Sequence, residues 1–106
     1  MASEKINQLQ LTQQNLQSVV SQKHQLESQL TELDSALTEI ATSKESFKII
    51  GKIMVTASKE SLRKELEDKR ELVTIRLKNF TRQEETLTRT IEELQQEVMN
   101  EMKKNE

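Results

Sequence analysis

The sequence has no cysteine, no proline, no tryptophan and no tyrosine, and only one glycine, in 106 residues. Without cysteine, the chain can form neither a disulfide framework nor a thiolate metal site. Without tryptophan or tyrosine, it has little with which to stack on bases, and its net charge of -2 indicates no basic patch. We therefore expect no nucleic-acid partner, no bound metal and no cofactor.

Long apolar runs are missing as well. Hydrophobic residues make up 33% of the chain and charged residues 32%, and the mean hydropathy is -0.75. This is too little apolar material for a compact globule of this length or for a membrane-spanning helix. The first ten residues, MASEKINQLQ, lack the apolar core of a signal peptide, so we expect a cytoplasmic protein with no membrane partner.

The polar residues form no catalytic motif. His24 is the only histidine and falls at a solvent-facing position, so it indicates a surface side chain rather than a metal ligand. Carboxylates are plentiful, but catalytic pairs need a pocket that shifts their pKa values, and two helices provide none. Gly51 stands in no phosphate-binding motif. We expect no enzymatic activity.

A heptad pattern predicts a first long helix over residues 4–41, with Ser3 as its N-cap. Eight of the ten a and d residues are aliphatic, which is typical of a coiled coil. The a positions are Leu9, Leu16, Lys23, Leu30 and Leu37, and the d positions are Thr12, Val19, Leu26, Leu33 and Ile40.

The same pattern predicts a second helix over residues 59–103, with Ser58 as its N-cap. Its d positions are Leu66, Val73, Phe80, Leu87 and Leu94, and its a positions are Arg70, Leu77, Glu84, Ile91 and Val98. The a and d residues of both helices are called the seam below. Because a short segment joins the helices, they should run antiparallel within a single domain of residues 1–106.

Two registers fit the antiparallel pair. In the preferred one, the paired residue numbers add to about 103, so that Leu9 lies with Leu94 and Leu30 with Val73. In the other register, one helix is shifted by one heptad, and the paired residue numbers add to about 110. In the preferred register Lys23 lies one layer from Glu84, and we expect the two charges to pair across the seam.

Residues 46–57, between the helices, predict a β-hairpin. Aliphatic and β-branched residues surround Gly51, and a two-residue loop at Gly51-Lys52 suits a type II′ turn. This register leaves both faces largely apolar, with the large side chains Phe47, Ile49, Ile50, Ile53, Met54 and Val55.

An isolated two-stranded hairpin is marginal in water, and its open edges invite other strands. We infer that this hairpin is an assembly element completed by hairpins of other subunits. The alternative is a hairpin folded back on its own helices.

Apolar residues leave the seam where the two chain ends should meet. Ile6 and Leu11 lie off the first seam, whereas Met99 and Met102 extend the second beside Val98. These residues either finish the coil and fray, or form an adaptable binding surface, for which methionine is well suited. Residue physics alone favours the first reading.

The segments FKIIGKIMV, ASKESLRKELEDKRE and RLKNFTRQEE, within residues 47–85, resemble a β-class prefoldin subunit. The shared features are a hydrophobic-Lys-x-x-Gly-x-hydrophobic-x-Val core at 47–55, the Arg-Gln-Glu of 82–84, and the order helix, hairpin, helix. The α class carries two hairpins, whereas the segment between these helices has room for one.

The resemblance implies a hexamer of two α-class and four β-class subunits, in which the hairpins build a β-barrel platform. It also implies an ATP-independent holdase that captures unfolded client proteins and passes them to a group II chaperonin. The implied client-binding tip residues are Ile6, Leu9, Leu11, Leu94, Val98, Met99 and Met102. The alternative function is a structural coiled-coil adaptor for one specific partner.

Overall fold

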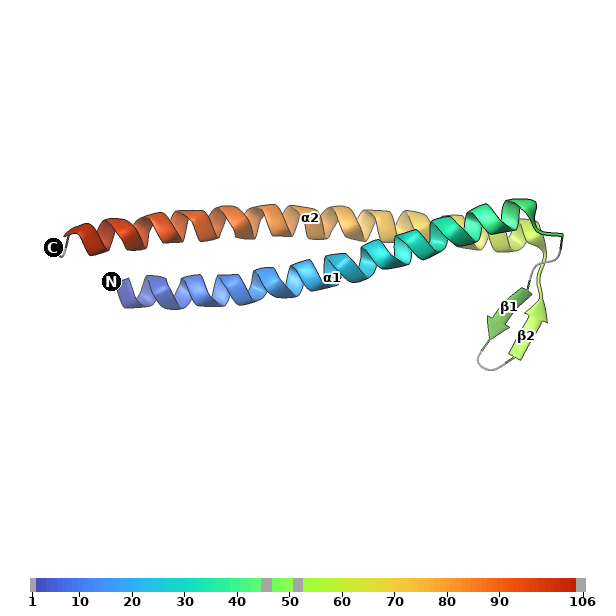
Figure 1. Cartoon of the computed structure of the whole chain (residues 1–106), viewed down its shortest axis with the longest axis horizontal. Coiled ribbons are helices and arrows are strands. Elements are labelled where there is room, and N and C mark those ends of the chain that lie inside the picture. Colours follow the sequence, from blue (N-terminus) through green and yellow to red (C-terminus); the bar gives the residue numbers. More distant parts are fainter. Residues whose placement is uncertain (1, 45–46, 51–52, 105–106) are drawn as a thin grey trace. The chain divides into compact units, whose positions relative to one another are not determined.

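The computed structural model describes residues 2–44, 47–50 and 53–104. The elements follow in the order α1 (Ala2–Thr42), β1 (Phe47–Ile50), β2 (Ile53–Thr56) and α2 (Lys59–Lys104) (Figure 1). The expected fold class, two long helices joined by one antiparallel hairpin, is confirmed. The helix bounds differ from the predicted 4–41 and 59–103 by only a residue or two.

Side chains form hydrogen bonds with backbone groups at the start of α2 and at the end of α1. Ser58 caps α2 as predicted: Ser61 N donates to Ser58 Oγ at 3.3 Å, and Leu62 N donates to the Ser58 carbonyl at 2.9 Å. The expectation that Ser3 caps α1 is wrong, because α1 already begins at Ala2. Lys59 Nζ donates to the Ala41 carbonyl at 3.1 Å, which places a positive charge at the C-terminal end of α1.

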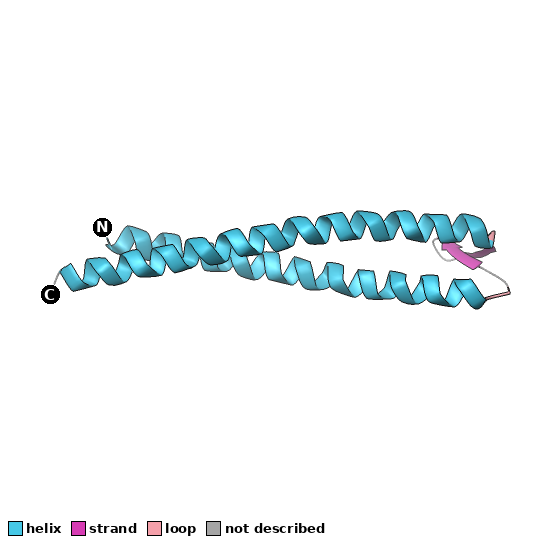
Figure 2. Ribbon diagram, turned by 90° about the horizontal axis from the view of Figure 1, so that it is seen from above, coloured by secondary structure: helices cyan, strands magenta, loops and turns pink. Residues whose placement is uncertain are grey.

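The chain divides into two compact units, one of Met1–His24 with Lys78–Glu106 and one of Gln25–Leu77. In each unit, a segment of α1 runs antiparallel to a segment of α2 (Figure 2). The first unit carries both chain ends, and the second carries the hairpin. The long helices therefore supply a two-helix seam to each unit.

The predicted seam residues are the ones that the helices shield from water. In the first unit Val19 and Ile91 are buried, and in the second Leu26, Ile40 and Val73 are buried. Most other seam positions are half-buried. Two helices cannot enclose a core, so most seam residues are only partly buried. Each therefore contributes less to the free energy of folding than the roughly 1.5–3 kcal/mol of a fully buried aliphatic side chain.

Ion pairs across the helices identify the register. Lys5 Nζ lies 3.6 Å from Glu97 Oε2 in the first unit, and Arg70 pairs with Asp34 in the second. A shift by one heptad would move these partners apart by about 10 Å. The structure therefore has the preferred register.

The polar residues of the seam behave in two ways. Lys23 Nζ donates to Glu84 Oε2 at 2.9 Å, which is the predicted pair, and both side chains are partly buried. Arg70, at an a position, is instead exposed, because its long side chain reaches out of the seam to the carboxylate of Asp34.

Candidate functional site

The hairpin has the predicted strand register. Phe47 pairs with Thr56, and the ladder continues to Ile50 opposite Ile53. Alternation along the strands therefore puts Ile49 and Met54 on one face. The expected type II′ turn at Gly51-Lys52 and the Ile50 side chain lie outside the described part of the structure.

The described apolar side chains of the hairpin remain open to solvent on both faces. Their exposed fractions are Phe47 49%, Ile49 67%, Ile53 66%, Met54 64% and Val55 36%. Large aliphatic side chains exposed side by side mark an interaction surface rather than a finished fold. The described residues of the chain leave this surface uncovered.

An ion pair joins the hairpin to α2. Lys48 Nζ, on β1, donates to both carboxylate oxygens of Glu65 at 2.9 and 3.0 Å. This hydrogen bond, with the positive charges of Lys48 and Lys69, holds the pKa of Glu65 below its usual value. The hairpin thus does lean on its own helix, but through a polar contact that leaves its apolar residues uncovered. Sequence periodicity gave no indication of this pair.

The chain ends carry the second exposed apolar surface, called the tip surface here. Its members lie off the seam, and their exposed fractions are Ile6 38%, Leu11 60%, Met99 54% and Met102 60%. The other predicted tip residues, Leu9, Leu94 and Val98, are half-buried on the seam. The seam therefore holds these three, and the four off-seam side chains are the ones available to a partner.

A charged pair lies beside the tip surface. Lys5 Nζ lies 2.7 Å from Glu101 Oε1, and Glu101 is half-buried. The hydrogen bond lowers the pKa of Glu101 and raises that of Lys5, with a further contribution to Lys5 from Glu97. The expectation that Met99 and Met102 extend the seam is therefore corrected: the next d position is Glu101, and both methionines face solvent.

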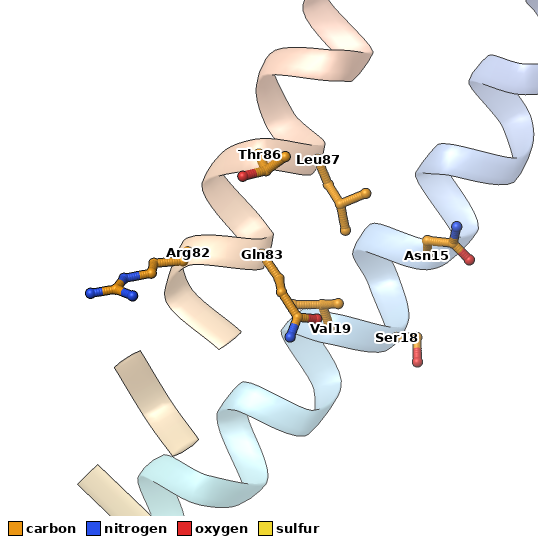
Figure 3. A pocket seen from close by; sticks show the side chains of 7 residues that line it. All are labelled: Asn15, Ser18, Val19, Arg82, Gln83, Thr86 and Leu87. Carbon is orange, nitrogen blue, oxygen red and sulfur yellow. The ribbon is translucent and has the colours of Figure 1, made fainter. Parts of the chain in front are cut away.

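A shallow groove of about 510 Å³ lies between the helices of the first unit (Figure 3). Leu87 points from α2 toward α1, and Gln83 lines the groove together with Val19, whereas Arg82 points away from α1. Of the Arg-Gln-Glu motif, Glu84 accepts a hydrogen bond across the helices, from Lys23 Nζ. The groove brings together no acid, base and nucleophile that could act as a catalytic group.

The described residues offer neither a metal site nor a membrane span. Over residues 2–44, 47–50 and 53–104, no three His, Asp or Glu side chains gather closely enough to hold a metal ion. In the same ranges, neither helix is long and apolar enough to cross a membrane. His24 is exposed, as expected from its heptad position.

Sequence reasoning missed one apolar feature of α2. Leu72 and Ile75 are each 51% exposed, although they lie beside the seam residue Val73. Heptad counting would have identified them, because they fall at positions c and f, which lie off the seam of a coiled coil.

Comparison with known proteins gives one consistent family. Residues 3–105 match the family described as "Prefoldin subunit". The chain is 39% identical over 98 residues to a prefoldin subunit beta of Archaeoglobus fulgidus, covering 90% of this chain and 84% of the relative. It is 33% identical over 96 residues to the prefoldin subunit beta of Methanosarcina acetivorans, covering 88% and 82%.

A solved structure has the same fold. The crystal structure of the prefoldin beta subunit from Thermococcus strain KS-1 superimposes with a TM-score of 0.88 at 32% sequence identity. The match covers 93% of this chain and 90% of that one. The likeness therefore includes both helices and the hairpin.

Proposed function

The chain belongs to the prefoldin family as a β-class subunit, and from this premise we propose that it works as an ATP-independent holdase in the cytoplasm. In this proposal it joins α-class and further β-class subunits in a hexamer. The complex captures unfolded client proteins and delivers them to a group II chaperonin.

The observation that carries the proposal is the pair of exposed apolar surfaces at the hairpin and at the chain ends. The hairpin exposes apolar side chains on both faces, and strands from other subunits would cover them in a closed barrel. A barrel also removes the open strand edges that a two-stranded hairpin leaves. The hairpin is therefore the assembly element of the proposal.

The tip surface is the client-binding element. Its four side chains are flexible or aliphatic and are between 38% and 60% exposed, so they can adapt to clients of different sequence. Each buried methylene group contributes about 0.8 kcal/mol, so a single tip holds a client weakly. Several tips acting on one client supply retention through avidity, and weak individual contacts let the client leave.

Substitution of the tip surface tests this function. We expect the combined change Ile6→Ser, Leu11→Ser, Met99→Ser and Met102→Ser to leave the mass of the complex unchanged, because none of these residues lies on the hairpin. The same change should strongly weaken suppression of aggregation of several unrelated unfolded proteins, measured by light scattering.

The matched control changes four exposed polar residues of the same helix ends to serine, namely Asn7, Gln10, Gln14 and Gln95. It should protect clients as well as the unsubstituted complex does. If the tip variant also protects fully, the clients bind elsewhere. If the unsubstituted complex suppresses no aggregation at all, the structural adaptor is the better explanation.

A further inference from the structure

The outward face of α2 is polar except at two neighbouring positions. Heptad positions c and f, called the outer face here, lie off the seam: f points away from α1, and c lies at the edge of the outer side. Leu72 and Ile75 are its two large apolar residues, and each is 51% exposed. The remaining c and f residues are Ser61, Glu65, Asp68, Asn79, Arg82, Thr86, Arg89, Glu93, Gln96, Asn100 and Lys103.

The hairpin is fixed to this same outer face. Glu65, which receives both hydrogen bonds from Lys48 of β1, is a c residue and lies one heptad before Leu72. One heptad of helix spans about 10 Å. Leu72 and Ile75 therefore follow along α2 from Glu65, within one compact unit.

Leu72 also borders a groove between the helices of this unit. The groove has a volume of about 400 Å³, and four aliphatic side chains line it, namely Leu33, Ala36, Leu72 and Val73. The charged residues Glu32 and Lys69 line it as well. An apolar groove with a few charged neighbours is suited to an apolar segment of another chain.

We propose that Leu72, Ile75 and this groove form a second part of the assembly interface, and that the β-hairpin of a second copy of this chain occupies it. The inference rests on the proposed function, in which hairpins of several subunits meet. The surface is continuous with the hairpin, and the hairpin is the described segment with exposed aliphatic side chains on both faces. A neighbouring hairpin that joins the first one would thus cover Leu72 and Ile75 as well.

The first test measures how tightly the complete complex holds together. We expect Leu72→Ser with Ile75→Ser to raise the concentration at which the complex dissociates by about tenfold or more, because both aliphatic contacts are lost. The matched control, Leu11→Ser with Met102→Ser, removes equally exposed residues from the tip surface and should leave that concentration unchanged. An unchanged value for the Leu72/Ile75 variant overturns the proposal.

The second test identifies the occupant and uses the lack of native cysteine. One chain carries Ile75→Cys, and a second copy carries Met54→Cys on the exposed hairpin. Mild oxidation of the mixed complex should link the two copies, whereas Arg89→Cys, at another f position, should not link to the hairpin. Equal linking from both positions, or none from position 75, overturns the proposal.

Failure of this inference differs visibly from failure of the proposed function. The proposed function fails if the unsubstituted chain forms no complex with an α-class subunit or protects no client. The inference fails if that complex forms and protects clients while the Leu72/Ile75 variant dissociates normally. If that variant assembles normally and only protects less, the outer face contacts clients rather than a neighbouring hairpin.

Discussion

The charged pair Lys23–Glu84 should contribute measurably to stability, and a double-mutant cycle measures by how much. Lys23 Nζ and Glu84 Oε2 lie 2.9 Å apart, with side-chain exposures of 24% and 32%. Two unit charges at 4 Å attract by about 1 kcal/mol in water and about 4 kcal/mol near a protein surface. Desolvation and lost side-chain freedom cancel most of this, and about 0.5–1 kcal/mol of coupling remains.

The cycle compares Lys23→Ala, Glu84→Ala and the double variant by thermal unfolding, followed by circular dichroism. Alanine keeps the helix, so changes in propensity do not hide the coupling. The expected coupling corresponds to roughly 2–8 °C of non-additivity in the melting temperature. Including Ile49→Asp in every member keeps assembly from contributing to the measured stability.

The control cycle uses Arg63 and Glu67, an i,i+4 pair on the exposed surface with 3.8 Å between Nη1 and Oε1. Its coupling should be smaller, because solvent surrounds both side chains. Strict additivity of Lys23 and Glu84 would contradict a pair held across the seam. It would mean that both side chains reach water independently.

Three further predictions concern the hairpin, a helix cap and a charged pair. Ile49→Asp should abolish assembly and keep most helicity: Ile49 is exposed in the single chain, but strands of other subunits would bury the new carboxylate at a cost of several kcal/mol. A normal mass of the complex in sedimentation would refute this prediction. Leu11→Asp, on the tip surface, is the control and should assemble normally. Ser58→Ala should lower the free energy of unfolding by about 1 kcal/mol, measured by denaturant titration. The control variant Ser61→Ala should leave the free energy of unfolding unchanged. The lowered pKa of Glu101 means that its pair with Lys5 stabilises fully above about pH 4.5 and is lost as the pH falls through the folded-state pKa. Between about pH 7 and about pH 3, the melting temperature of the Glu101→Gln variant should therefore fall less than that of the unsubstituted chain. An equal fall would contradict the pairing.

Most of the fold could be predicted because its signals are local. Leucine and valine at heptad spacing identify the helices, and the aliphatic residues around Gly51 identify the hairpin register. The pair Lys23–Glu84 was predictable because both residues interrupt the seam, and an isolated charge in an apolar layer requires a partner.

The ion pairs outside the seam could not be predicted in the same way. Lys48–Glu65 depends on how the hairpin leans on α2, and no repeat in the sequence encodes that angle. Lys5–Glu101 depends on the register and on charged residues at the end of the coil. There the heptad pattern shows only that the aliphatic seam stops, and not which charges will pair. Periodicity locates apolar residues, whereas long charged side chains select among several partners within reach.

The way the chain distributes its few apolar residues follows from these constraints. Aliphatic residues on the seam hold the two helices together, and most of them remain only partly shielded. A two-stranded hairpin has little stability of its own, so exposed aliphatic side chains there favour the state in which other strands cover them. Pairing of the two strands and assembly of the complex should therefore be coupled. A change that removes the neighbouring strands also removes most of the contacts that stabilise the hairpin, whereas the Lys48–Glu65 pair to α2 remains.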